Sequence, residues 1–125
     1  MKVALALGKT GVAVDLPEGF RYRVLEARSA RPLADWRSSL ESALDRPIGA
    51  PTLAELARGK RTVAISICDI TRPAPNRLTV PPVLRRLEEA GIRRENVTIL
   101  IATGLHRPAT AGEIRDICGD EISAE

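Results

Sequence analysis

Two short segments hold most of the side chains in this sequence that could do chemistry. The first, D-I-T-R-P-A-P at residues 69–75, places a carboxylate, a hydroxyl and a guanidinium within four positions. Its two prolines restrict the backbone and would hold these groups in place. The second, A-T-G-L-H-R-P at residues 102–108, contains His106, the single histidine of the chain. Because an imidazole titrates near neutral pH, His106 is a candidate general acid or base.

Arg72 is the candidate anion ligand of the first segment. An arginine fork binds a carboxylate or a phosphate through two parallel hydrogen bonds, and Asp69 can accept hydrogen bonds from sugar hydroxyls or orient Arg72. The simpler alternative is an Asp69–Arg72 salt bridge that braces a turn. For His106 the simpler alternative is a solvent-exposed loop side chain. The residue types alone leave these alternatives open.

Cys68 directly precedes the first segment, so a nucleophilic Cys68–His106 pair is a further candidate. A cysteine at the end of a strand is more often a small buried hydrophobic residue. Cys68, Asp69 and His106 lack the close spacing of typical metal ligands, and we predict no metal site from them. G-K-T at residues 8–10 resembles the end of a P-loop, but Val3 stands where that motif needs glycine, and a strand-like segment follows. It is more typical of a turn.

The pattern of apolar residues predicts that both chemical segments follow strands of a parallel sheet. Residues 62–68 and 97–103 are nearly continuous apolar runs, typical of strands buried on both faces. A helical stripe over 79–90 separates them, and T-A-G-E at 110–113 has the spacing of a capping box before a last helix. Strand, helix, strand, helix indicates a parallel sheet with right-handed crossovers. Because loops that follow parallel strands leave the sheet at one edge, the two segments are expected to face a common crevice.

The first half of the chain is less regular. Residues 2–7 and 12–16 are typical of a β-hairpin, and residues 21–27 alternate loosely like a further strand. Apolar residues from 33 to 44 follow helical spacing, and Thr52 can cap a short helix after them. The predicted fold class is therefore α/β, a Rossmann-like parallel sheet flanked by helices, with an amino-terminal β-hairpin.

Composition argues against several other classes of protein. The 125 residues carry a formal net charge of +3 and include one tryptophan, one tyrosine and one phenylalanine. Nucleic-acid binding usually shows a concentrated basic face, often with aromatic stacking platforms, so we expect no nucleic-acid partner. The apolar stretches are too short to span a bilayer, and the two cysteines form no C-x-x-C motif. The expectation is a cytoplasmic protein with no membrane partner.

Residues 69–75 and 102–108, together with P-I-G at 47–49 and L-A-E-L-A-R-G-K at 53–60, resemble the amino-terminal domain of nickel-pincer-nucleotide-dependent lactate racemases. The likeness runs in order over most of the chain. D-x-T-R-P-x-P followed by A-T-G-x-H-R-P is a far more specific signal than either motif alone. The resemblance implies that residues 1–125 are the amino-terminal domain of a larger two-domain racemase. The carboxyl-terminal domain, absent from this chain, would be its partner.

The resemblance also implies a function, that of a 2-hydroxy-acid (lactate-type) racemase or epimerase. The cofactor of such enzymes is the nickel-pincer nucleotide, Ni(II)-pyridinium-3,5-bisthiocarboxylate mononucleotide, to which hydride is transferred. By resemblance, the cofactor site is lined by four consecutive residues, Asp69, Ile70, Thr71 and Arg72. Arg72 would also lie near the carboxylate of the small-molecule 2-hydroxy acid, and His106 would be one of two histidines that exchange the hydroxyl proton.

The family's cofactor-anchoring lysine, nickel-ligating histidine and second catalytic histidine have no counterpart in this chain. We therefore expect the cofactor to be anchored mainly by the missing domain, and this chain alone to be inactive. Two other functions stay open on the residues. One is a small α/β anion-binding module that uses Arg72 and loop amides. The other is a hydrolase that uses Cys68 and His106, which would need a cysteine thiol of lowered pKa.

Overall fold

The structure, a computed structural model, describes residues 1–124. It divides into two compact units, the first from Met1 to Arg31 and the second from Pro32 onward. Both chemical segments lie in the second unit. None of the helices in the described part of the chain is long and apolar enough to cross a membrane.

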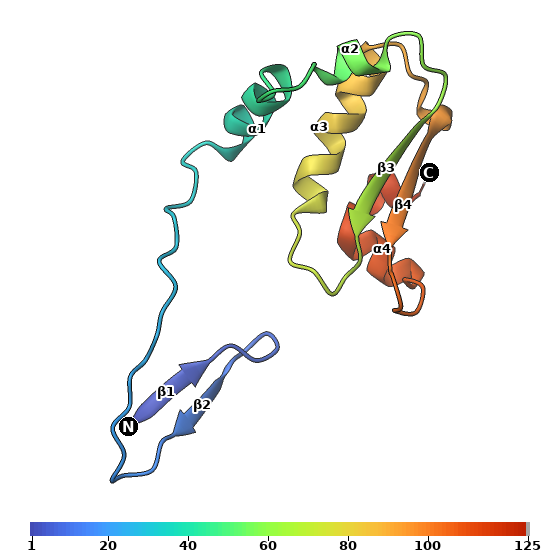
Figure 1. The fold of residues 1–125 in the computed structure, drawn as a ribbon. Helices are drawn as coiled ribbons and strands as arrows, with labels where there is room; N and C mark the ends of the chain where they lie inside the picture. The colour runs from blue at the N-terminus through green and yellow to red at the C-terminus, as the bar shows by residue number, and fades with distance from the viewer. Residues whose placement is uncertain (125) are drawn as a thin grey trace. The chain divides into compact units, whose positions relative to one another are not determined.

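The first unit contains the predicted β-hairpin, formed by β1 (Lys2–Leu5) and β2 (Val12–Asp15) in antiparallel pairing (Figure 1). Its turn is closed by the Gly11 amide, which donates a hydrogen bond to the Leu7 carbonyl at 2.9 Å. G-K-T at residues 8–10 lies in this turn, with a strand and not a helix after it, so it is no P-loop. The predicted strand over 21–27 is wrong, because neither edge of the hairpin pairs with that segment and a strand needs a paired neighbour.

The second unit alternates helices and strands, which confirms the predicted α/β class. Its elements, in chain order, are α1 (Trp36–Asp45), α2 (Leu53–Ala57), β3 (Val63–Cys68), α3 (Asn76–Glu89), the 3-10 helix η1 (Arg94–Asn96), β4 (Val97–Ala102), α4 (Ala111–Cys118) and α5 (Asp120–Ser123). The strands β3 and β4 pair in parallel, from Val63 opposite Val97 to Cys68 opposite Ala102. Both strands therefore end at the same edge of the sheet, and the loops after them start side by side (Figure 1).

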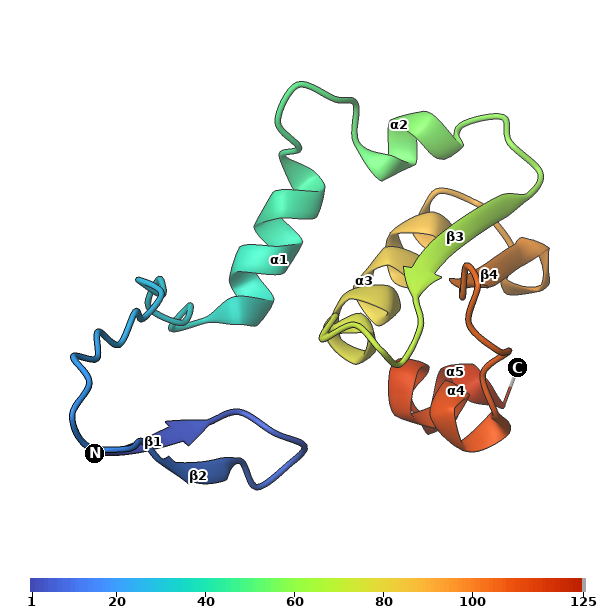
Figure 2. The ribbon, with the colours of Figure 1, turned by 60° about the horizontal axis from the view of Figure 1, so that its bottom comes forward.

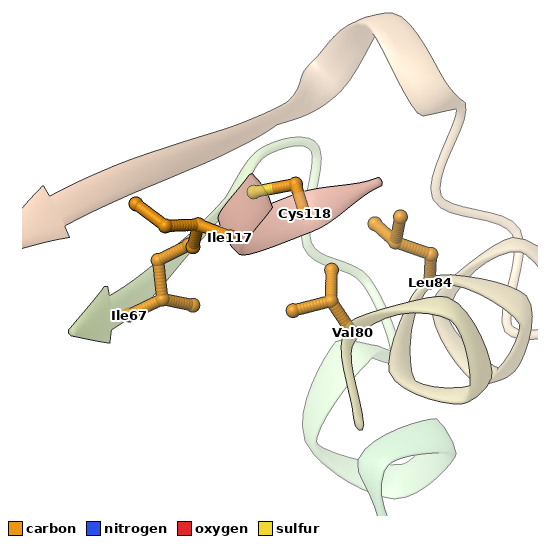
Figure 3. Packing of buried hydrophobic residues seen from close by; sticks show 5 residues of the cluster. All are labelled: Ile67, Val80, Leu84, Ile117 and Cys118. Carbon is orange, nitrogen blue, oxygen red and sulfur yellow. The ribbon is translucent and has the colours of Figure 1, made fainter. Parts of the chain in front are cut away.

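The helices α3 and α4 pack against one face of this sheet (Figures 1 and 2). In the core, Ile67 of β3 meets Val80 and Leu84 of α3, and Ile117 and Cys118 of α4 (Figure 3). These five side chains are buried. Val97, Ile99 and Ile101 of β4 pack against this cluster, so the core holds both strands and the positions at which the two loops begin.

The other face of the sheet is open, so the prediction of strands buried on both faces is wrong for this chain. Burial alternates along β3 and β4, and outward-pointing Leu100 is 52% exposed. The apolar run is nevertheless nearly continuous, because the outward-facing set includes Ala64, Leu100 and Ala102 as well as polar Ser66. Apolar residues on the outer face conceal the two-residue period of a half-exposed strand.

Helix starts follow local capping chemistry. Thr110 and Glu113 form the predicted capping box at α4, and Thr52 and Glu55 form another at α2, with each threonine hydroxyl accepting a hydrogen bond from the glutamate amide at 3.3 Å. The helix α3 begins at Asn76, before the start indicated by its apolar stripe. The earlier start brings the first turn of α3 to the end of the loop that carries residues 69–75.

Candidate active site

A cavity of about 540 Å³ opens at the carboxyl ends of β3 and β4. Its lining includes Asp69, Arg72 and His106, so the structure brings these three predicted residues together, as the parallel topology predicts. Cys68 and Asn76 line the same cavity. The volume is within the usual range for small-molecule sites.

Asp69 is the buried centre of the site. Its side chain is almost fully enclosed, and its Oδ2 lies 2.5 Å from Nδ1 of His106. Its Oδ1 accepts two hydrogen bonds from Thr71, one from the hydroxyl at 2.6 Å and one from the backbone amide at 3.2 Å. The Thr71 hydroxyl, and after it His106, lower the pKa of Asp69, against the opposing effect of burial. Asp69 is therefore held as a carboxylate.

The loop after β3 is a series of tight turns. The amide of Arg72 donates to the carbonyl of Asp69 at 3.2 Å, and the amide of Ala74 donates to the carbonyl of Arg72 at 2.8 Å. The Asn76 side chain closes the loop by donating from Nδ2 to the carbonyl of Cys68 at 3.4 Å. Because proline fixes its own φ, Pro73 and Pro75 stiffen the loop between these bonds.

Arg72 is the cation of the cavity. Within residues 1–124 its guanidinium makes no hydrogen bond or ion pair, whereas Asp69 is bonded to His106 and Thr71. The alternative of an Asp69–Arg72 salt bridge is therefore wrong. A guanidinium without a protein partner at a cavity wall can accept a carboxylate or phosphate in a bidentate arrangement.

The predicted cofactor segment does not all face the cavity. Thr71 directs its hydroxyl to Asp69, and Ile70, which is 45% exposed, does not line the cavity. The cavity wall from this segment is therefore supplied by Asp69 and Arg72. Asn76 was not predicted from the sequence, and only its place directly after the proline-bearing loop could have signalled it.

The loop after β4 positions His106 by backbone bonds and by one ion pair. The His106 amide donates to the carbonyl of Thr103 at 3.0 Å, in a turn where Gly104 has a φ of +58°. The next residue, Arg107, donates two hydrogen bonds to Glu113, at 2.8 and 2.7 Å. Arg107 and the Thr110 amide lower the pKa of Glu113 to about 2. This ion pair ties the His106 loop to the first turn of α4.

Cys68 is exposed at the end of β3 and lines the cavity together with His106. In the described part of the chain the two side chains are not hydrogen-bonded, and Nδ1 of His106 is bonded to Asp69. Nor do the described residues include a cluster of three histidine, cysteine, aspartate or glutamate side chains that could hold a metal ion.

Comparison with known proteins identifies a family that this chain matches. Residues 7–125 match the family described as lactate racemase N-terminal domain. The chain belongs to this family. It is 33% identical over 122 residues to a lactate racemase of Thermoanaerobacterium thermosaccharolyticum, covering 96% of this chain and 28% of that protein. It is 42% identical over 86 residues to a lactate racemase of Lactiplantibacillus plantarum, covering 69% of this chain and 20% of that protein.

A solved structure agrees with these matches. The chain superposes on the lactate racemase apoprotein from Thermoanaerobacterium thermosaccharolyticum with a TM-score of 0.74 at 32% identity, over 98% of this chain and 28% of that one. In each comparison this chain spans less than a third of the length of the lactate racemase that it matches.

Proposed function

We propose that this chain is the amino-terminal domain of a larger two-domain enzyme, a 2-hydroxy-acid racemase or epimerase of the lactate type. One observation carries the proposal. In a chain of the lactate racemase family, the same cavity is lined by an imidazole held by a carboxylate and by a guanidinium that has no partner within residues 1–124. The guanidinium suits the carboxylate of a 2-hydroxy acid, and the imidazole suits its hydroxyl.

Arg72 binds the substrate carboxylate in this proposal. Its guanidinium is free of protein partners within residues 1–124, so binding the substrate breaks no existing ion pair. Two parallel N–H donors fix both the position and the orientation of a carboxylate. The carbon that carries the hydroxyl is then held in a defined place relative to His106.

His106 exchanges the hydroxyl proton. The hydrogen on the hydroxyl-bearing carbon of such an acid is too weakly acidic for an ordinary side-chain base, so the proposed reaction removes it as hydride. As the hydride leaves, the hydroxyl must lose its proton, and a neutral imidazole is a suitable acceptor. The product has the opposite hand, so a second base is needed on the other side, and this chain has one histidine. The second base belongs to the remainder of the enzyme.

The hydride acceptor proposed is the nickel-pincer nucleotide. The cavity fits it, because a nucleotide is anionic, the Arg72 cation at the wall has no partner among the described residues, and Asn76 adds an amide there. Asp69 and Arg72, the two residues of the predicted cofactor segment that line the cavity, would contact it from this chain, with the rest of its binding site in the second domain. When bound, this group supplies the chemistry that accepts and returns the hydride.

The test uses the natural full-length protein that contains this chain, loaded with the nickel-pincer nucleotide. Each enantiomer of lactate, and of a set of larger 2-hydroxy acids, is incubated with it and analysed by chiral chromatography. We expect either enantiomer of at least one acid to be converted to an equal mixture. A loaded protein that binds these acids but leaves their configuration unchanged would instead indicate an anion-binding module.

A further inference from the structure

We infer that Asp69 is a positioning residue for His106, and that Thr71 sets the orientation of Asp69. Together these three side chains determine which nitrogen of the imidazole carries the proton. The inference rests on the proposed function in one respect, that His106 is the base. The arrangement of the three side chains stands on the structure alone.

Asp69 determines which nitrogen of the His106 imidazole carries the proton. Asp69 Oδ2 lies 2.5 Å from His106 Nδ1, and an ionised carboxylate only accepts hydrogen bonds. Nδ1 must therefore carry the proton in the neutral ring, which leaves the lone pair on Nε2. His106 is half exposed and lines the cavity, whereas Asp69 is buried. Nε2 is thus the nitrogen available to a substrate hydroxyl, and the carboxylate stabilises the imidazolium that forms when Nε2 takes a proton.

Thr71 holds the Asp69 carboxylate from the side opposite to His106. Thr71 donates to Asp69 Oδ1 twice, from its hydroxyl at 2.6 Å and from its backbone amide at 3.2 Å. A backbone amide can only donate, so whatever atom occupies the Oδ1 position must accept. Thr71 therefore fixes one side of residue 69 as an acceptor and directs the other side to His106. The bond from that other side to His106 links two loops whose residues are 37 positions apart.

Asp69→Asn, a substitution that hardly changes side-chain volume, is expected to move the ring proton of His106 to the other nitrogen. The oxygen of the substituted side chain must face the Thr71 amide, so its NH₂ group faces Nδ1 of His106. Nδ1 must then accept, the ring proton moves to Nε2, and the base loses its lone pair on the substrate side. Because general-base catalysis is typically worth about 10²–10⁴-fold, we expect kcat to fall by about that factor.

Substitutions of Thr71 are expected to have smaller effects on kcat than Asp69→Asn. Thr71→Val removes the hydroxyl donor and keeps the amide donor, so the orientation of Asp69 is weakened but not lost. We expect kcat to fall about 2- to 10-fold, as for the loss of one hydrogen bond. Thr71→Ser retains the hydroxyl, so its kcat should fall less than that of Thr71→Val. This pair keeps the inference testable even if Asp69→Asn does not fold.

The experiment measures kinetics and tautomer in the same full-length, cofactor-loaded protein. With histidine labelled by ¹⁵N, the His106 signals are those that vanish in His106→Gln, and their shifts at alkaline pH report which nitrogen carries the proton. We expect the proton on Nδ1 in the parent and in Thr71→Ser, and on Nε2 in Asp69→Asn, with the kcat losses given above.

Two results would overturn the inference: an unchanged tautomer in Asp69→Asn, whatever its activity, or an inverted tautomer in the parent. A tautomer that inverts as expected while His106→Gln retains the full rate would leave the positioning role standing and refute the proposed role of His106 as base. Failure of the inference and failure of the proposed function are therefore distinguishable.

Discussion

Replacing Arg72 tests the anion-binding half of the proposed site with little structural side effect. Its guanidinium makes no hydrogen bond or ion pair within residues 1–124, so its removal leaves no protein group without a partner. Thermal stability should therefore stay near that of the parent, as for most substitutions away from the core. Arg72→Lys keeps the charge but loses the two-pronged geometry that matches a carboxylate.

The magnitude follows from the lost hydrogen bond. A hydrogen bond to a charged group contributes about 1.5–3 kcal/mol, which corresponds to roughly a ten- to hundredfold change in affinity. In the full-length enzyme we expect Arg72→Lys to raise KM for both enantiomers by that factor, or to lower cofactor occupancy, while some turnover remains at saturation. The assay is steady-state kinetics from each enantiomer, with the cofactor content of every preparation measured.

Arg85→Lys is the matched control, because Arg85 lies on α3 and pairs with Glu41 outside the cavity. It should leave KM and cofactor occupancy unchanged. If Arg72→Lys behaved like Arg85→Lys in both measurements, Arg72 would bind neither substrate nor cofactor, and the reasoning about the site would be wrong.

Three further predictions concern the base, the loop anchor and the chain by itself. His106→Ala should slow racemisation from both enantiomers equally, by about 10²–10⁴-fold, because both directions use both bases; near-normal rates at full cofactor occupancy would make His106 an ordinary loop residue. Glu113 has a pKa of about 2 in the folded chain against an ordinary 4.5, so it stabilises folding above pH 4.5 and loses this effect as the pH falls toward 2. Glu113→Gln should therefore lower the thermal unfolding midpoint at pH 6 and flatten its decline between pH 4.5 and 2, and an unchanged profile would contradict the Arg107–Glu113 anchor. Residues 1–125 expressed alone should neither racemise lactate nor retain stoichiometric nickel, which chiral chromatography and elemental analysis would check; activity or bound nickel would contradict the need for a second domain.

The elements around the site were predictable because their signals are local. An apolar, β-branched run before residue 69 indicates β3, and the capping box of Thr110 and Glu113 marks the start of α4. The parallel order of strands then places both loops at one edge, without any knowledge of side-chain contacts. The burial of the sheet was overestimated, since an apolar residue such as Leu100 does not reveal whether another element covers it.

The central bond of the site was not predictable, because it joins two residues that are distant in the chain. The bond between Asp69 and His106 spans 37 positions, and spacing carries no signal for such a pair. From the sequence, a salt bridge between Asp69 and Arg72, the nearest opposite charge, stayed open as an alternative. The structure excludes it, since the turn at residues 69–72 and the burial of Asp69 direct its carboxylate to Thr71 and His106.

The proposed reaction is tested most directly by following the hydrogen on the reacting carbon. The cofactor-loaded full-length protein is given one enantiomer of lactate with deuterium at that carbon, in ordinary water, and the product of opposite hand is examined by mass spectrometry. Transfer of this hydrogen as hydride within the site, with His106 exchanging only the hydroxyl proton, predicts that the product retains its deuterium. Racemisation with loss of the deuterium to water, or no racemisation at all, would contradict this account.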